Sequence, residues 1–241
     1  MRSVPWLPVT TSLVIVLFVI LIFRRYRRRA STPLLMWGIG LAMFGIASMA
    51  EAYSTLGWHP VAFRLWYLNG ALLNAAWLGQ GTVFLLSRRA HLPWIIFGLL
   101  LIGTVVGGIL VFRTPIDAAH FRVGMPLSAQ YREILPPGAP VRKLTPVFNI
   151  YGSIALVGGA LYSAWLLLRK ESVPQRVVGN VLIALGGVAM GVASTLVRFS
   201  MADYLYVAEL VAAGSMFTGF LLATTRIPVS LPLAPPVEVM S

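Results

Sequence analysis

The chain lacks cysteine altogether and has few charged residues of either sign. Of its 241 residues, 11% are charged, 58% are hydrophobic and only three are histidine. Without cysteine it can form no disulfide, no thiolate nucleophile and no cysteine metal site. Soluble domains carry about 25% charged residues. The composition therefore excludes a water-soluble globule and indicates an integral membrane protein.

Several classes of chemistry lack the residues they need. The histidines His59, His91 and His120 fall in separate stretches, so they do not form a metal or bis-histidine haem site. The last apolar run has no lysine for a retinal Schiff base. No Gly-x-Ser-x-Gly elbow, phosphate loop or dinucleotide fingerprint is present. We therefore expect no cofactor and no metal, and the residues favour no enzyme.

Most of the sequence consists of apolar runs that are long enough to span a membrane. A bilayer crossing takes about 20 apolar residues, and the pattern predicts an all-α integral membrane protein, a seven-transmembrane-helix bundle. The predicted runs are Val9 to Phe23, Pro33 to Tyr53, Val61 to Leu86, Pro93 to Phe112, Val147 to Leu168, Val177 to Val197 and Tyr204 to Thr224. Residues 1–226 thus form one membrane domain.

Two segments lack this hydrophobicity. Residues 113–146 contain six prolines and are predicted to form the one long loop, whose restricted backbone could shape a lid. Residues 227–241 contain four prolines and are predicted to be an extended or disordered tail.

The basic residues predict an orientation. The net charge of +12 comes largely from residues that flank apolar runs, so it does not indicate nucleic-acid binding. Five arginines lie between 24 and 29, directly after the first run, and such clusters stay in the cytoplasm. We therefore expect the N terminus outside, the C terminus in the cytoplasm, and a multi-pass protein of the inner (plasma) membrane.

Small residues recur at helical spacing on three of the runs. Such faces let helix backbones approach closely in lipid. We interpret them as packing faces within the bundle, with a homodimer or another protein partner as the alternative; membrane lipids are expected around them. The three sets are Gly38, Ala42, Gly45 and Ser48; Gly152, Ala155, Gly159 and Ser163; and Gly187, Gly191 and Thr195.

Ionisable residues inside predicted spans mark the candidate site, because burying a charge in lipid is costly. Glu51, Arg64, Arg198 and Glu209 are all predicted at similar depth near the outer surface. They can pair as a structural clamp or bind a ligand. Uncharged polar residues extend this layer, and they line either an outward-facing vestibule or a hydrogen-bonded core: Asn69, Asn149, Tyr151 and Tyr206.

The order of features resembles the seven-helix sensor region at the N terminus of some bacterial histidine kinases. The resemblance lies in the basic run 24–29, the second run from Leu34 to Ala52, and Phe63 to Tyr67 at the start of the third. The segments 144–152 and 158–165 resemble uncharacterised bacterial membrane proteins. The sensor resemblance implies an outward, ligand-responsive bundle. No kinase or coiled coil follows Arg226 here, so a signal would need a separate partner.

Three functions follow as hypotheses. The first is a ligand-binding or sensor-like module with an outward-facing polar vestibule. The second is an accessory or scaffold subunit of a larger membrane complex, which the glycine-rich faces favour. The third is a lipid-modifying enzyme that uses Glu51 or Glu209 as a general base, although neither acid has an evident nucleophile or metal partner in the sequence.

Overall fold

A computed structural model describes residues 6–170, 174–198 and 205–224, with side chains for 10–170, 174–192 and 207–223. This part of the chain is helical and contains no strand. The segments that form the bundle are α1 (Trp6–Arg28), α2 (Thr32–Ser54), α3 (Pro60–Trp66), η1 (Tyr67–Leu73), α4 (Asn74–Leu86), α5 (Leu92–Arg113), α7 (Pro140–Ser153), η3 (Ile154–Gly158), α8 (Gly159–Arg169), α9 (Pro174–Arg198) and α10 (Leu205–Thr224). The segments α3, η1 and α4 follow one another without a break, as do α7, η3 and α8.

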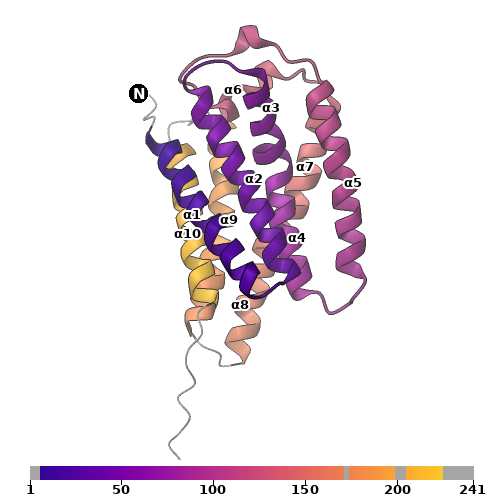
Figure 1. The fold of residues 1–241 in the computed structure, drawn as a ribbon, viewed down its shortest axis with the longest axis vertical. Helices are drawn as coiled ribbons and strands as arrows, with labels where there is room; N and C mark the ends of the chain where they lie inside the picture. Colours follow the sequence, from indigo (N-terminus) through magenta and orange to yellow (C-terminus); the bar gives the residue numbers. More distant parts are fainter. Residues whose placement is uncertain (1–5, 171–173, 199–204, 225–241) are drawn as a thin grey trace, which may run out of the picture.

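The helices stand side by side as an elongated bundle (Figure 1). α2 packs against α1 and α4, α4 packs against α7, α8 packs against α9, and α10 closes the bundle by contacting both α9 and α1. α5 lies at the edge, where its main contacts are with α4, η1 and α7. Each of the seven predicted apolar runs coincides with helix in the described residues.

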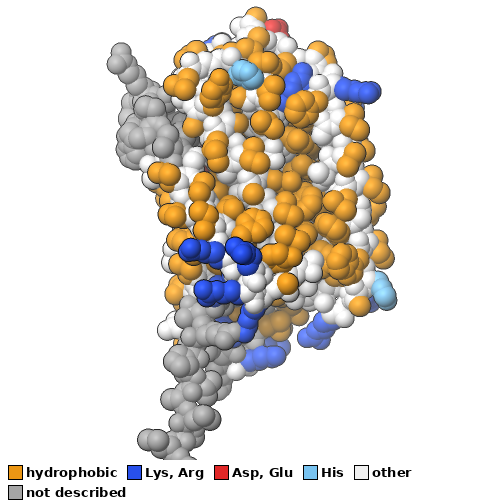
Figure 2. Space-filling view, viewed as in Figure 1, with side chains coloured by type: hydrophobic (Ala, Val, Ile, Leu, Met, Phe, Trp, Pro, Cys, Tyr) orange, Lys and Arg blue, Asp and Glu red, His pale blue; other side chains and the backbone are white. Residues whose placement is uncertain are grey.

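Four helical stretches in the described residues are long and apolar enough to cross a membrane, as expected of a membrane protein. They are Thr32–Ser54, Leu92–Arg113, Pro140–Arg169 and Pro174–Val192. Their outward side chains are largely aliphatic, and Figure 2 shows this hydrophobic surface over the middle of the molecule. A lipid environment accounts for such exposure, since it removes the cost of contact with water.

The predicted start of the fifth run is wrong, because the helix begins at Pro140 and not at Val147. Pro140 occupies the first turn, where a missing N–H breaks no helical bond. Pro146 then lies inside the helix. The mixed residues of this first part misled the prediction: Val141 is fully buried, whereas Lys143 is exposed.

Glycines set the closest helix contacts, as the small-residue stripes predicted. A Cβ at Gly152 of α7 would lie 2.2 Å from the carbonyl carbon of Ala75 in α4, and one at Gly159 would lie 2.3 Å from Thr82 Cγ2. Gly38 of α2 faces Phe23 of α1. Gly38, Gly152 and Gly159 therefore pack within the chain, whereas Gly191 of the third set has nothing within 4 Å of its Cβ position, and a protein partner at these faces stays a prediction.

The two ends of the bundle differ in charge. The basic end holds the last turn of α1, the α4–α5 loop and the end of α8, and lysine and arginine side chains gather there (Figure 2). At the opposite end, which we call the cap end, three of the acidic side chains of the described residues lie: Glu51, Asp117 and Glu133. The positive-inside rule counts lysine and arginine rather than acids, and the cap end also carries basic residues, including Arg64, Arg122 and Arg132, so the orientation stays a prediction.

Candidate functional site at the cap end

The segment between α5 and α7, predicted as a loop, folds into a cap over the bundle. It contains the short helix η2 (Ala118–His120) and the eight-residue helix α6 (Leu127–Ile134). Leu127, Ile134 and Leu135 of this segment belong to the same buried core as the aromatic residues of α3. The cap is therefore a packed layer, and α6 also contacts α9.

One buried carboxylate ties the cap to the bundle. Oε1 of Glu51 in α2 accepts a hydrogen bond of 2.8 Å from the backbone N–H of Leu127, the first residue of α6. Glu51 is only 5% exposed. The N-terminal N–H groups of a helix have no partner within the helix and carry partial positive charge, so they favour a carboxylate.

Gln130 holds the cap in shape from within. Its side chain is 1% exposed, accepts from the N–H of Arg122 at 2.7 Å, and donates to the carbonyls of Met125 at 2.8 Å and Arg122 at 3.2 Å. The turn that it braces contains Gly124 with φ of 83°, a conformation that favours glycine. Sequence reasoning missed Gln130, which resembles any other polar loop residue.

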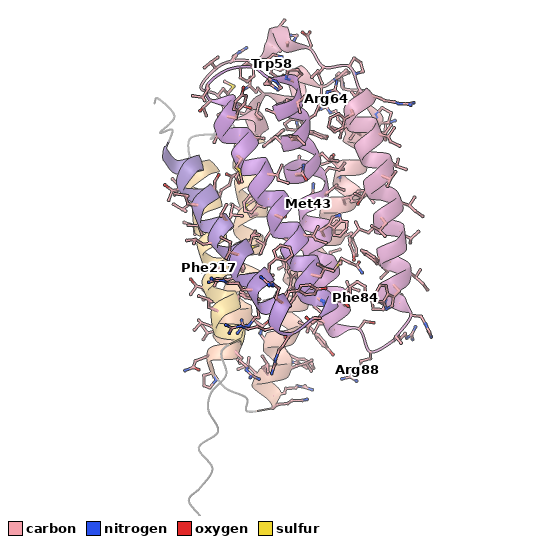
Figure 3. All side chains as sticks on the ribbon, viewed as in Figure 1. Met43, Trp58, Arg64, Phe84, Arg88 and Phe217 are labelled. Atoms are coloured by element: carbon pink, nitrogen blue, oxygen red, sulfur yellow. The ribbon has the colours of Figure 1, made fainter. Side chains whose placement is uncertain are left out.

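An aromatic cluster fills the space beneath the cap. Tyr131 of α6 lies 6.1 Å from Trp66 and 5.9 Å from Tyr67 between ring centroids. Trp58, labelled at the top of Figure 3, packs in a tilted arrangement against Phe63 and against Phe121 of the cap. Packed rings thus lie between α6, α3 and η1, and the outward-facing vestibule stays a prediction.

Arg64 is bound to the end of α5 and not to an acid. Its Nη1 donates to the carbonyl oxygen of Val111, one of the last carbonyls of that helix, and its guanidinium lies 5.9 Å from the ring centroid of Phe112. A cation is favourable at a helix C-terminus. His120 pairs with Asp117 and Arg122 pairs with Glu133 in the cap, whereas Arg64 makes its contacts with the end of α5 and not with Glu51 or Glu209.

Of the two predicted acids, Glu51 lies near the end of α2 and Glu209 in the first turns of α10. The backbone positions of Arg198 and Tyr206 end α9 and begin α10. Their side chains lie outside the described residues, so their part in the predicted layer remains a prediction.

The other predicted polar residues make hydrogen bonds along the interface of α4, η1 and α7. Nδ2 of Asn149 donates to the carbonyl of Ala71 at 2.9 Å, and Asn69 donates to Leu65 of its own helix at 2.9 Å. Tyr151 donates its hydroxyl to Gln80, which is fully buried and donates in turn to the carbonyl of Pro93 at 2.8 Å. These contacts are those of the hydrogen-bonded core that the sequence left open as an alternative.

No group of three or more histidine, aspartate or glutamate side chains that could hold a metal occurs in the part of the chain that the structure describes. Comparison with known protein families, characterised proteins and solved structures finds no match to this chain. The resemblance to a kinase sensor region therefore rests on the sequence features alone, and the site must be interpreted from its geometry.

Proposed function

We propose that the protein is a seven-helix sensor-like module of the plasma membrane, with its N terminus outside and its C terminus in the cytoplasm. The cap receives the stimulus, and the bundle passes it to a separate partner at the basic end. The observation that carries the proposal is the hydrogen bond between Leu127 of the cap and buried Glu51 of a spanning helix.

The contacts at Glu51 offer a route from the cap to the bundle. A ligand that displaces α6 removes the amide that stabilises the Glu51 carboxylate. Glu51 is buried in α2, so losing this hydrogen bond raises the cost of keeping its carboxylate inside the bundle. A shift of α2 relative to the helices packed against it would lower that cost, which would give the bundle two states biased by the cap.

Two fluorescent probes can test this coupling without knowledge of the ligand. One is attached at Val123→Cys in the cap, where the side chain is 67% exposed, and the other at His91→Cys in the exposed α4–α5 loop. In lipid nanodiscs we expect Glu51→Ala to change both probe signals, because it undocks the cap and alters the bundle. The matched control Glu51→Gln keeps an acceptor oxygen and should leave the cap probe unchanged.

A cap that moves alone would contradict the proposal. In that case Glu51→Ala changes the signal at position 123 and leaves the signal at position 91 as in the parent. A parent-like signal at both positions would also contradict it, because the hydrogen bond would then not control cap docking.

An accessory subunit is a second candidate function, and α5 favours it. This helix lies at the edge of the bundle and exposes a row of aliphatic residues that includes Leu99, Ile102 and Val106. Purification in mild detergent, with a photoreactive residue at position 99, separates the two functions. A stoichiometric partner crosslinked to α5 supports the subunit, and crosslinks to lipid alone support the sensor.

A further inference from the structure

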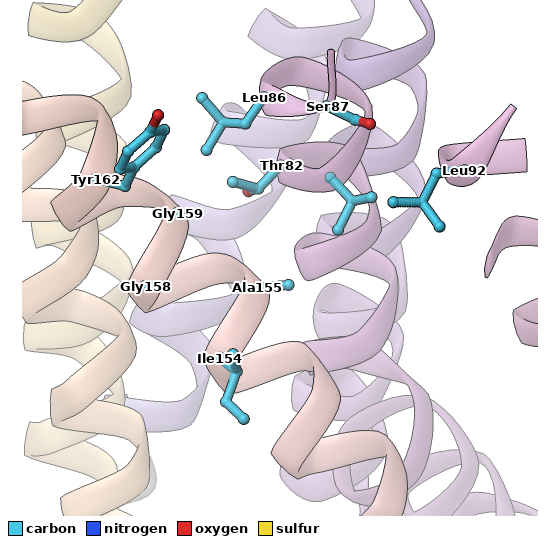
Figure 4. Close-up of a pocket in the computed structure, with 10 residues that line it drawn as sticks. Thr82, Leu86, Ser87, Leu92, Ile154, Ala155, Gly158, Gly159 and Tyr162 are labelled. Atoms are coloured by element: carbon cyan, nitrogen blue, oxygen red, sulfur yellow. The ribbon is translucent and has the colours of Figure 1, made fainter. Parts of the chain in front are cut away.

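A second feature lies toward the other end of the bundle, away from the cap. It is a groove of about 370 Å³ between α4, η3 and α8, lined mainly by carbon (Figure 4). This volume is in the range of small-molecule sites, at roughly 300–1,000 Å³. The lining residues are Thr82, Val83, Leu86, Ser87, Leu92, Ile154, Ala155, Gly158, Gly159 and Tyr162.

Two adjacent glycines form one wall and have different surroundings. Gly159 packs against α4, where a Cβ would meet Thr82. Gly158 has nothing within 4 Å of the position of a Cβ, so the groove is open in front of it. Tyr162 and Leu86 lie on opposite sides of this opening, from α8 and α4 (Figure 4). The groove can therefore accept a linear apolar chain.

The rim of the groove at the basic end is positively charged. Ser87 and Leu92 both line the groove, and the loop between them carries the exposed residues Arg88 and Arg89. The Ser87 hydroxyl donates to the carbonyl of Arg89 at 3.2 Å, which fixes the loop at this place. Arg88 is labelled beyond the end of α4 in Figure 3.

On the α8 side of the groove, two aromatic rings and an arginine follow one another along the helix. Tyr162 stacks with Trp165 at 5.9 Å between centroids, and the Arg169 guanidinium lies 4.1 Å from the Trp165 ring. Both rings are more than 40% exposed. Tyrosine and tryptophan are typical of the boundary between acyl chains and headgroups, and arginine at that boundary binds phosphate.

We infer that this groove binds one anionic phospholipid from the leaflet at the basic end. An acyl chain lies along Gly158 and Tyr162, and the headgroup phosphate lies among Arg88, Arg89 and Arg169. The apolar lining fits the chain, and the positive rim complements the headgroup. This site needs only that the protein spans a membrane, and it does not depend on the sensor function.

Native mass spectrometry of the delipidated full chain in detergent tests the inference, with dioleoyl phosphatidylglycerol and dioleoyl phosphatidylcholine as the titrated lipids. We expect one phosphatidylglycerol to bind at least tenfold more tightly than phosphatidylcholine. Gly158→Leu, which fills the groove, should weaken this binding at least tenfold. The matched control is Gly98→Leu on α5, where a Cβ also meets nothing within 4 Å, and it should bind as the parent does.

A separate variant tests the contacts with the lipid headgroup. Arg88→Gln combined with Arg89→Gln should weaken phosphatidylglycerol binding at least threefold and leave phosphatidylcholine binding unchanged. If Gly158→Leu does not fold, Tyr162→Ala replaces it, since removal of this exposed ring should also weaken binding. Equal affinity for the two lipids, or parent-like affinity in the groove variant or the arginine variant, overturns the inference.

Discussion

At the scale of single residues, one buried side-chain amide forms hydrogen bonds with two neighbouring helices. Gln80 is fully buried in α4. It accepts a hydrogen bond from the hydroxyl of Tyr151 in α7 and donates one to the carbonyl of Pro93 at the start of α5. A buried polar group without a partner is costly in lipid, where no water replaces it. Gln80 thus joins three helices through one side chain.

This arrangement predicts coupling between Gln80 and Tyr151. Gln80→Met and Tyr151→Phe should each lower the free energy of unfolding by roughly 0.6 kcal/mol and at most about 1.7 kcal/mol, the average and the maximum measured for hydrogen bonds between membrane helices. The double variant should cost less than the sum of the two, because the second substitution removes a partner already lost. Reversible unfolding in mixed micelles measures the four free energies, and strict additivity would show that the two side chains do not interact.

At the scale of elements, the contact between α4 and α7 depends on the absence of side chains. Gly79 and Gly152 bring the two backbones together, and a Cβ at Gly79 would lie 2.8 Å from the carbonyl oxygen of Gly152. Beside this contact, Ala71 lies in the π-helical segment η1, and its carbonyl accepts a hydrogen bond from Asn149 of α7. The π-helical segment η1 and the close approach of the α4 and α7 backbones therefore both occur at the interface with α7.

The close contact predicts a strong effect of one methyl group. Gly152→Ala should lower the free energy of unfolding by about 1–3 kcal/mol or more, because its Cβ would overlap the backbone of α4. Gly98→Ala is the matched control on a helix face with open space, and it should be neutral or stabilise by about 0.4–1 kcal/mol. Thermal melting in detergent compares the variants, and equal melting temperatures would exclude the tight contact.

At the scale of the whole molecule, the bundle has a capped end and a basic end. The cap closes its end with buried Leu127 and Ile134, while the arginines of the α1 terminus and of the α4–α5 loop gather at the other. The orientation with the cap outside the cell stays a prediction, made from the cluster of arginines that follows the first apolar run.

Cysteine labelling can test that orientation, since the parent chain has no cysteine. An impermeant maleimide added to intact cells should modify Val123→Cys and spare His91→Cys, which should react only after the membrane is permeabilised. Both positions are exposed. Labelling of position 91 in intact cells, with protection of position 123, would show that the topology is the opposite of the one predicted.

The helix positions were predictable because they depend on local properties. Run length, apolar composition and flanking arginines identified the long helices of the described residues but not the short cap helices η2 and α6, and the glycine stripes on α2 and α7 identified faces that do pack. The fifth helix was placed seven residues too late, since Arg142, Lys143 and Pro146 are typical of a loop. Their cost is offset by burial of Val141 and by a bond of 3.1 Å from Arg142 to the carbonyl of Leu135.

By itself, the sequence determined that this is a helical protein with helices suited to a membrane, and it indicated the orientation, because hydrophobicity and charge act within each segment. Only the tertiary structure decided which polar groups meet. Glu51 binds Leu127 from 76 residues away, and Tyr151 binds Gln80 from 71 residues away. Spacing along one helix defines a shared face but not what another helix brings to it. That is why Arg64, predicted beside an acid, instead binds a helix end, and why the predicted loop is a cap.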